Sequence, residues 1–208
     1  MLTTGIIKDN PVLSLGMALP FAVIASTTLK SGVLMSVVML IAIVPSVIMC
    51  SLFDKHIPGW LKLPFGCAIS LGCITAFVQY IRPEHPVIVQ DLGVYIPLAA
   101  FNMILLESIN ACGQNNAAPV IWLSTKMCVG FALVMCSLSA VRELMVYRTI
   151  WDVEVPFAKL AISGAGLPFF GFILLGFFAA FFRWIGRLYM QFAYSRVHES
   201  SERKEEAA

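Results

Sequence analysis

Residues 33–52 form a run that carries no charged side chain and is apolar almost throughout. A helix needs about 20 mainly apolar residues to cross the hydrocarbon core of a bilayer, and this run has that length. Strands of a membrane β-barrel would instead alternate apolar and polar residues. The run therefore predicts a membrane-spanning helix and places the chain among all-α integral membrane proteins.

Five further apolar segments accompany this run. With 59% hydrophobic and only 12% charged residues, the chain is too apolar for a soluble domain, so each segment is a candidate for a spanning helix. The six predicted segments are 13–29, 33–52, 63–81, 92–106, 120–141 and 160–182. We expect one membrane domain over residues 1–194, followed by a polar, disordered tail at 195–208.

Two short motifs occur twice in the same order. The motif L-G-x-x-x-P-x-A begins at Leu15 and again at Leu92, and L-P-F begins at Leu63 and again at Leu167, each time with a glycine nine residues after the leucine. The chain therefore looks like two copies of one three-segment unit, about residues 5–82 and 88–189. Because three is an odd number, the second copy enters the membrane from the opposite side, and the repeat is inverted.

The first and fourth segments open the two copies, and each contains a proline, Pro20 or Pro97. Proline removes a backbone donor and obstructs a helical hydrogen bond, so we expect both segments to be kinked or broken. In transporters with inverted repeats, such segments meet near the middle of the membrane and form the working site. Ordinary kinked packing helices are the alternative. Asn102, five residues after Pro97, is the best candidate to line an ion path.

Charge predicts the orientation of the chain. Basic residues favour the cytoplasmic side, and the larger number falls on the side of both termini, mainly because of a cluster after the last segment. We therefore expect both termini in the cytoplasm. We also expect the first segment to remain in the mature chain, since the start carries a single lysine, Lys8, and no convincing cleavage site.

Polar and sulfur-containing side chains in the apolar segments have simple structural interpretations. The six cysteines form no C-x-x-C pair and are typical of small packing residues. Cys112 is the exception that could have another role, because several asparagines lie near it in the sequence. Glu107 and Lys126 are expected to snorkel or to pair with each other. Arg142 and Glu143 are expected to anchor the end of the fifth segment at the membrane interface. Nothing in the sequence indicates a nucleotide loop, a hydrolytic triad or a nucleic-acid surface.

The start of the chain, G-I-I-K-D-N-P-V from Gly5, resembles the opening of the Rnf/Nqr membrane subunits of the RnfE and NqrD type. The stretch L-G-V-Y-I-P-L from Leu92, with Asn102 after it, is similar to a second motif of that family. Further matches are Gly130-Phe131, Arg142-Glu143 and the stretch from Pro168 to Gly176. These matches run in order over nearly the whole chain.

The resemblance implies a role in redox-driven ion translocation. Members of this family pair with a homologous membrane subunit of opposite orientation, and the pair holds a two-iron two-sulfur cluster within the membrane. Flavin-bearing and iron–sulfur subunits of the complex exchange electrons with that cluster, and the cycle moves Na⁺ or H⁺. The resemblance also implies the inner membrane of a bacterial or archaeal cell.

The cysteines that hold this cluster in the family are missing at the matching positions. The position on the first segment is Ala18, or Leu19 if the prolines are aligned, and the position on the fourth is Met103. Alanine and leucine do not bind iron, and a neutral thioether is a poor substitute for the thiolates of such clusters. Cys112 lies about 13 Å further along a helix than Met103, too far for a simple replacement. We expect no catalytic residue, metal or cofactor on this chain.

Three functions are compatible with these observations. The first, which we favour, is a divergent, non-catalytic subunit of an Rnf/Nqr-type complex. The second is a stand-alone inverted-repeat transporter for an ion or a small solute, and the third is a purely structural subunit. The sequence does not choose between Na⁺ and H⁺ and does not name the electron donor or acceptor.

Overall fold

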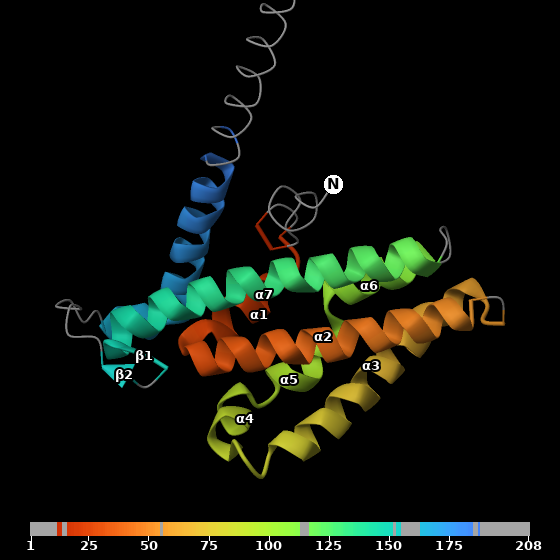
Figure 1. Ribbon diagram of the computed structural model, residues 1–208, viewed down its shortest axis with the longest axis horizontal. Coiled ribbons are helices and arrows are strands. Elements are labelled where there is room, and N and C mark those ends of the chain that lie inside the picture. The colour runs from red at the N-terminus through yellow and green to blue at the C-terminus, as the bar shows by residue number, and fades with distance from the viewer. Residues whose placement is uncertain are drawn as a thin grey trace, which may run out of the picture.

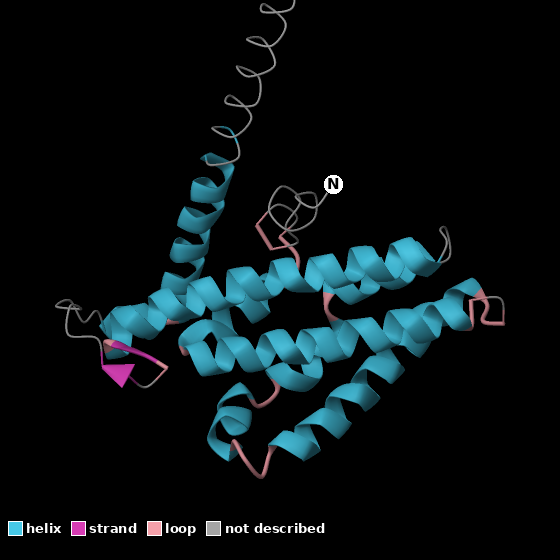
Figure 2. Ribbon diagram, viewed as in Figure 1, coloured by secondary structure: helices cyan, strands magenta, loops and turns pink. Residues whose placement is uncertain are grey.

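The structure, a computed structural model, describes residues 12–13, 16–54, 56–112, 117–151, 153–154, 163–184 and 187. Most of these residues are helical (Figures 1 and 2). Within these ranges the strands are β1 (Thr149–Ile150) and β2 (Val153–Glu154), a two-residue antiparallel pair that follows the longest helix. The all-α prediction is therefore confirmed apart from this small hairpin.

Four described helical stretches are long and apolar enough to cross a membrane. They are α2 (Leu29–Leu52), α3 (Gly59–Ile81), the stretch Tyr95–Cys112 and α7 (Ala117–Tyr147). The predicted segments 33–52, 63–81 and 120–141 are confirmed, but each helix begins several residues earlier than predicted. Hydropathy marks only the part of a helix within the hydrocarbon, whereas hydrogen bonding continues the helix through residues such as Lys30 and Gly59.

The first and sixth predicted segments are shorter in the described structure. Segment 13–29 contains the six-residue helix α1 (Leu19–Ile24) and the 3₁₀ turn η1 (Ala25–Thr27). Segment 160–182 contains the 3₁₀ turn η3 (Ser163–Gly166) and an apolar helix, Pro168–Trp184, which leads away from the bundle (Figure 1). Six spanning helices and the inverted repeat therefore stay predictions, and the tail at 195–208 lies outside the described residues.

The fourth predicted segment is divided into several pieces. After α3, the chain forms the short helix α4 (Pro86–Leu92), then α5 (Tyr95–Leu98), the 3₁₀ turn η2 (Ala99–Phe101) and α6 (Met103–Cys112). The glycine between α4 and α5, Gly93, has a φ of 41°, a conformation that residues with a Cβ rarely adopt. This turn redirects the chain from α4 into α5.

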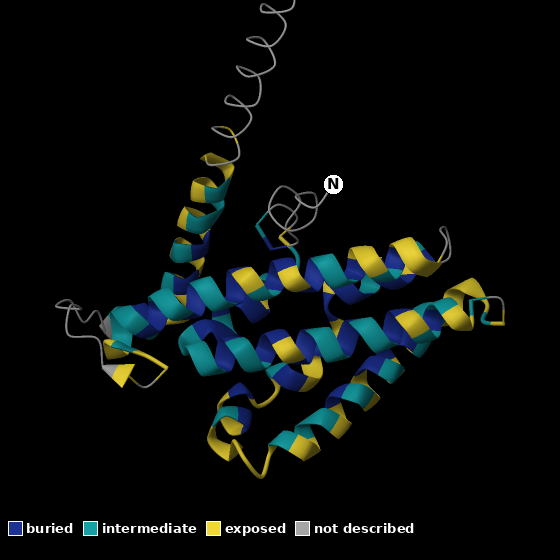
Figure 3. Ribbon diagram, viewed as in Figure 1, coloured by how far each residue is buried: buried dark blue, intermediate teal, exposed yellow. Residues whose placement is uncertain are grey.

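α2 is the central helix of the bundle. It packs against α3, α6 and α7 and also contacts η1 and η2. Half of its apolar stretch is buried, and most of the rest is intermediate in exposure (Figure 3). Gly32 permits a close approach to α7, because a Cβ at this position would lie 2.1 Å from Ser139 Oγ. Small residues of this kind let membrane helices approach closely, and packing is what holds such helices together.

Buried hydroxyl groups within the described helices are satisfied by hydrogen bonds, with Ser70 as the exception among these residues. Five buried serines donate to the carbonyl oxygen four residues earlier: Ser36, Ser46, Ser108, Ser124 and Ser139. Ser70 on α3 is also buried, but its hydroxyl has no hydrogen-bond partner among the described residues. An unpaired polar atom is costly in an apolar interior.

Candidate functional site

Two helix breaks of the same construction are the main irregular features of the bundle. In each, a short helix that contains a proline passes into a 3₁₀ turn and then into one extended residue, which starts the next helix. The extended residue is Thr28 before α2 (φ −129°, ψ 155°) and Asn102 before α6 (φ −77°, ψ 153°). The prediction that the first and fourth segments are broken is confirmed.

The prolines themselves do not make the breaks, which corrects the mechanism inferred from the sequence. Pro20 lies in the first turn of α1, where a helix has no use for the missing amide donor. Pro97 lies within α5, and the chain leaves helical geometry only at Asn102. Pro45 is accommodated inside the continuous helix α2. The breaks instead follow the residues that cap the next helix.

Both extended residues use their side chains as N-caps. The backbone N–H of Ser31 donates to Thr28 Oγ1 at 3.2 Å, and the N–H of Leu105 donates to Asn102 Oδ1 at 2.9 Å. A capping oxygen satisfies one of the amide groups that a helix start leaves without a partner. Each break is therefore stabilised by its own sequence.

Asn102 also joins the second break to the central helix. Its amide nitrogen donates to Ala99 O at 2.7 Å and contacts Met39 Sδ, midway along α2, at 3.2 Å. The side chain is only 2% exposed. Asn102 thus lies near the middle of the bundle, as expected of a residue on an ion path. In this conformation, however, its side chain is fully engaged in hydrogen bonds that stabilise the break. Its role in ion movement stays a prediction.

Arg142 is buried at a point where several segments meet. The prediction that it anchors the helix at the membrane interface is therefore wrong. Arg142 is 1% exposed, and its guanidinium donates to Val23 O in α1, to Ser26 Oγ at 2.8 Å, and to the carbonyl oxygens of Ala165 and Gly166 at 3.2 and 2.9 Å. The ends of α1 and η3 leave carbonyl groups without helical donors, and a guanidinium has five N–H groups to offer. Arg142 therefore ties three segments together.

Glu143 acts on the other side of the same break. Its carboxylate Oε2 accepts a hydrogen bond from the N–H of Leu29, the first residue of α2, at 2.5 Å. A carboxylate is favoured at a helix N-terminus and a cation at a C-terminus. Arg142 and Glu143 thus brace the two helix ends that face each other across Thr28, and we call this pair the junction.

The last described helix also begins at the junction. A Cβ on Gly171 would lie 3.0 Å from Val23 Cγ1 and 3.3 Å from Arg142 Nη1. Four segments, namely α1 with η1, α2, α7 and the helix Pro168–Trp184, therefore meet at two neighbouring buried residues of opposite charge. The sequence contained one indication of this site, namely a basic and an acidic residue side by side near the end of an apolar helix. The sequence alone did not reveal that both residues are buried.

The residues that the resemblance aligns with the cluster cysteines differ in their surroundings. Ala18 is buried and has a left-handed backbone (φ 58°), Leu19 is half-buried, and Met103 is 59% exposed in the first turn of α6. α1 packs against α7, whereas α5 packs against α3 and α4. The expected meeting of Pro20 with Pro97, both exposed, therefore stays a prediction.

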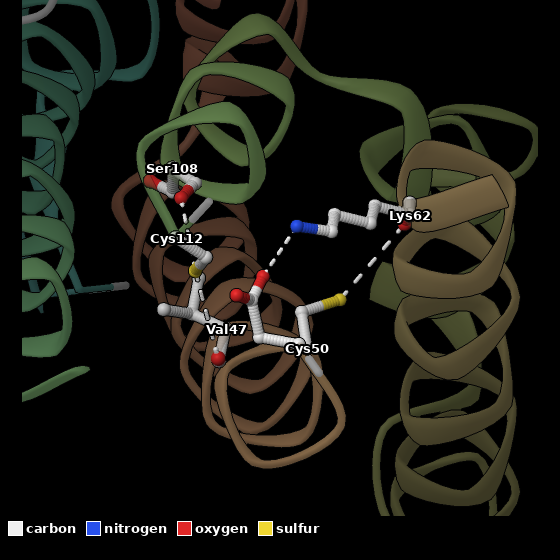
Figure 4. A network of polar contacts seen from close by, with 6 residues as sticks. Val47, Cys50, Lys62, Ser108 and Cys112 are labelled. Carbon is white, nitrogen blue, oxygen red and sulfur yellow. Dashed lines mark hydrogen bonds and ion pairs between the residues drawn. The ribbon is translucent and has the colours of Figure 1, made fainter. Parts of the chain in front are cut away.

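The cysteines are packing residues wherever the structure describes their thiols. Cys112 Sγ donates to Ser108 O at 3.3 Å and Val47 O at 3.9 Å, and Cys50 Sγ donates to Lys62 O at 3.9 Å (Figure 4). Nearby, Lys62 Nζ pairs with Asp54 Oδ1 at 2.5 Å across the turn between α2 and α3. The described residues include no group of three or more side chains suited to a metal ion.

Lys126 and Glu107 do not pair with each other in the described structure. The Lys126 ammonium lies 5.3 Å from the centre of the Trp122 ring, a cation–π contact, and Glu107 is exposed on α6. Of the two arrangements that the sequence left open, the structure therefore contradicts the ion pair.

Two clefts lie on either side of α4. The smaller, of about 360 Å³, is lined by charged side chains that include Lys30, Glu84, Asp91 and Glu143. The larger, of about 710 Å³, lies between α3 and the α4–α5 segment, and Pro97 is part of its wall. Pro97 is thus the predicted site residue that lines a cavity.

Comparison with known proteins decides the family. The chain matches the family described as "Rnf-Nqr subunit, membrane protein" over residues 1–181. It belongs to the Rnf–Nqr family. The resemblance seen in the sequence motifs is therefore confirmed, and the four long apolar helices agree with a membrane protein of this family.

Several relatives within the Rnf–Nqr family are named as a subunit of an ion-translocating oxidoreductase complex. The relative from Haemophilus influenzae (strain PittEE) is 30% identical over 151 residues, which cover 71% of this chain and 63% of the relative. The relative from Methanosarcina acetivorans is 30% identical over 142 residues, 68% of this chain and 67% of the relative. The chain thus spans about two thirds of the length of these relatives.

Proposed function

We propose that this chain is a membrane subunit of an Rnf-type complex that couples electron transfer to the translocation of Na⁺ or H⁺. The observation that carries the proposal is the family match over residues 1–181, together with relatives whose names place them in an ion-translocating oxidoreductase complex. Its partners would be a homologous membrane subunit of opposite orientation and the flavin-bearing and iron–sulfur subunits of the complex.

The two helix breaks support a role in translocation. They lie in corresponding segments of the predicted repeat, they have the same construction, and both contact α2. Broken helices in membrane proteins are tolerated where protein or a cavity satisfies their backbone, and in transporters they form the ion or substrate site. We include in the proposal six spanning helices arranged as two inverted repeats, with both termini cytoplasmic.

We further propose that the chain contributes no ligand to an iron–sulfur cluster. Ala18, Leu19 and Met103 do not fit iron, because none offers a thiolate, and the free cysteines that the structure describes lie elsewhere in the bundle. Cys112 is buried, and its thiol donates to the α2 carbonyl of Val47. The chain's own residues would then serve to shape the bundle and to hold the breaks, while electron carriers belong to other subunits.

The redox role is tested by purifying the tagged full chain from its native membrane. We expect flavin-bearing and iron–sulfur subunits to copurify, and deletion of the gene to abolish redox-driven sodium or proton uptake by membrane vesicles, with restoration by the intact gene. Purification of the chain alone, with uptake unchanged in the deletion strain, would contradict the proposal. That result would favour the stand-alone transporter, the candidate that the missing thiolates support.

The cluster is tested separately on the purified membrane pair. We expect iron analysis and electron paramagnetic resonance of the reduced pair to show no two-iron signal attributable to this chain. A stoichiometric signal would contradict the expectation and direct attention to Cys112 or to partner cysteines. The variant Ala18→Cys with Met103→Cys, and its alternative Leu19→Cys with Met103→Cys, measure how much of the family's cluster pocket remains.

A further inference from the structure

The proposed redox function assigns no ligand to the larger cleft, although Pro97 forms part of its wall. It lies between α3 and the α4–α5 segment and has a volume of about 710 Å³, within the range of roughly 300–1,000 Å³ that is typical of ligand pockets. Its lining residues are Ile74, Thr75, Val78, Gln79, Arg82, Pro86, Val89, Gln90, Gly93, Ile96 and Pro97. The cleft therefore combines an apolar wall with a few polar groups.

One end of the cleft lies at the edge of the membrane. Arg82 directly follows Ile81, the last residue of the spanning helix α3, and the neighbouring Tyr80 is 77% exposed. Tyrosine and arginine at the end of a spanning helix are typical of the headgroup level. Ile74 lies about 12 Å further into the membrane along α3, at about 1.5 Å per residue.

The chemistry of the lining changes along this direction. Arg82 marks the surface end, and Gln79 adds an amide one turn or less away, whereas Ile74, Val78 and Ile96 make the deeper part apolar. An apolar wall beneath a polar rim matches a lipid, whose acyl chain continues from its headgroup into the hydrocarbon. A ligand that is polar throughout would leave the deeper wall without a suitable contact.

The charge of the lining favours an anionic headgroup. Arg82 is the one ionisable residue in the wall of the cleft, and its guanidinium has no ion-pair or hydrogen-bond partner among the described residues. The nearby carboxylates of Glu84 and Asp91 line the smaller cleft, on the other side of α4. A guanidinium binds phosphate with paired, charge-assisted hydrogen bonds.

We propose that this cleft binds one phospholipid with an anionic headgroup, such as phosphatidylglycerol. The lipid phosphate pairs with Arg82, and one acyl chain lies along Val78 and Pro97. Ile74 and Ile96, which are 1% and 2% exposed, form the floor of the cleft beneath it. Paired, charge-assisted hydrogen bonds from the guanidinium would hold the phosphate of the headgroup. The proposal depends only on the membrane location of the chain. A bound lipid would also cover α5 beside Pro97 and support the segment that leads into the second break.

The headgroup contact is tested by native mass spectrometry of the full chain in detergent. The protein is titrated with dioleoylphosphatidylglycerol and, separately, with dioleoylphosphatidylcholine, which has the same acyl chains. We expect one saturable, tighter site for phosphatidylglycerol and a loss of about tenfold or more in its affinity in Arg82→Gln, the size expected for a hydrogen bond to a charged group. Arg183→Gln, an exposed arginine on the last described helix, should leave the affinity unchanged.

The acyl contact is tested by filling the deeper part of the cleft. Thr75 lines the cleft, whereas the adjacent Ala76 is exposed on the same helix and does not. We expect Thr75→Trp to displace the lipid and Ala76→Trp to leave binding intact, with circular dichroism confirming that both variants are folded. This pair tests the proposal independently of Arg82→Gln.

Four outcomes would overturn the proposal. Equal affinity for the two lipids, or equal affinity of Arg82→Gln and the unaltered chain, would exclude headgroup recognition by Arg82. Competition by glycerol phosphate alone, at concentrations similar to those of the lipid, would indicate a soluble phosphate as the ligand. Binding that persists in Thr75→Trp would place the lipid elsewhere on the protein. None of these results depends on the redox role.

Discussion

At the scale of single residues, the junction shows how a buried charge pair can stabilise a helix break. Arg142 supplies donors to carbonyl oxygens at the ends of α1 and η3, and Glu143 accepts from the first amide of α2. A buried ion is costly unless hydrogen bonds satisfy it. Here the broken helices provide those hydrogen bonds, so the charges and the breaks stabilise each other.

Replacement of Arg142 by glutamine should destabilise the protein strongly. The variant removes the guanidinium donors of Ala165 O and Gly166 O, and Val23 O keeps only the hydroxyl of Ser26. We expect a loss of about 3 kcal/mol in unfolding free energy. Thermal unfolding in detergent measures the change, with Arg183→Gln as the exposed control. A loss below about 1 kcal/mol, the worth of one ordinary hydrogen bond, would contradict the role assigned to the junction.

Ser70 offers the opposite test, because its buried hydroxyl has no partner among the described residues. Ser70→Ala removes an unsatisfied group, so stability should stay the same or rise. Ser46→Ala, which removes a hydroxyl bonded to Ala42 O at 2.7 Å, should lower stability by about 0.5–1 kcal/mol. If Ser70→Ala proved the more harmful of the two in the same unfolding assay, the Ser70 hydroxyl would have a partner that the described residues do not supply.

At the scale of elements, the contact between α2 and α7 depends on two small residues. Gly32 and Ser139 meet so closely that a Cβ on Gly32 would overlap the serine side chain. The two longest described helices are held at this distance along the centre of the bundle. The first break lies just before this contact, so the position of α2 against α7 also sets the geometry of the junction.

Gly32→Ala should therefore separate α2 from α7 and cost about 1–3 kcal/mol, the usual range for overpacking a tight site. Ser139→Gly in the same chain should recover part of the loss, since it removes the side chain that the new methyl group meets. Gly72→Ala, with nothing within 4 Å of a Cβ, is the matched control. Unfolding temperatures that are equal for Gly32→Ala and Gly72→Ala would mean that the helices do not pack as closely as described.

At the scale of the whole molecule, one helix stands apart from the bundle. The helix Pro168–Trp184 begins at the junction and then leads away (Figure 1), and its aromatic side chains are largely exposed, among them Phe169, Phe172, Phe177 and Phe181. In a membrane, such a surface faces lipid or another protein of the complex. The arrangement is consistent with a chain whose packing is completed by a neighbour.

The proposed topology makes a direct prediction at this scale. With six spanning segments, Ala208 lies in the cytoplasm and the turn after α3 lies outside. Reporter fusions at Ala208 and after Glu84 should therefore give opposite signals, a cytoplasmic reporter being active only at Ala208. A cytoplasmic signal from the turn after Glu84 would contradict the six-segment arrangement and, with it, the inverted repeat.

The sequence by itself determined the membrane class and three of the long helices, because apolarity acts over a few neighbouring residues. It also predicted breaks in two segments, but from the prolines, which do not make them. Only the tertiary structure decided where the breaks fall and what holds them. Thr28 and Asn102, not the prolines, end the short segments, and Arg142 is separated by 116 positions from Ser26, the hydroxyl that it binds. Contacts between residues so far apart in the chain leave no periodic signal, since they arise only when packing brings helix ends with unpaired carbonyl groups to the same buried place.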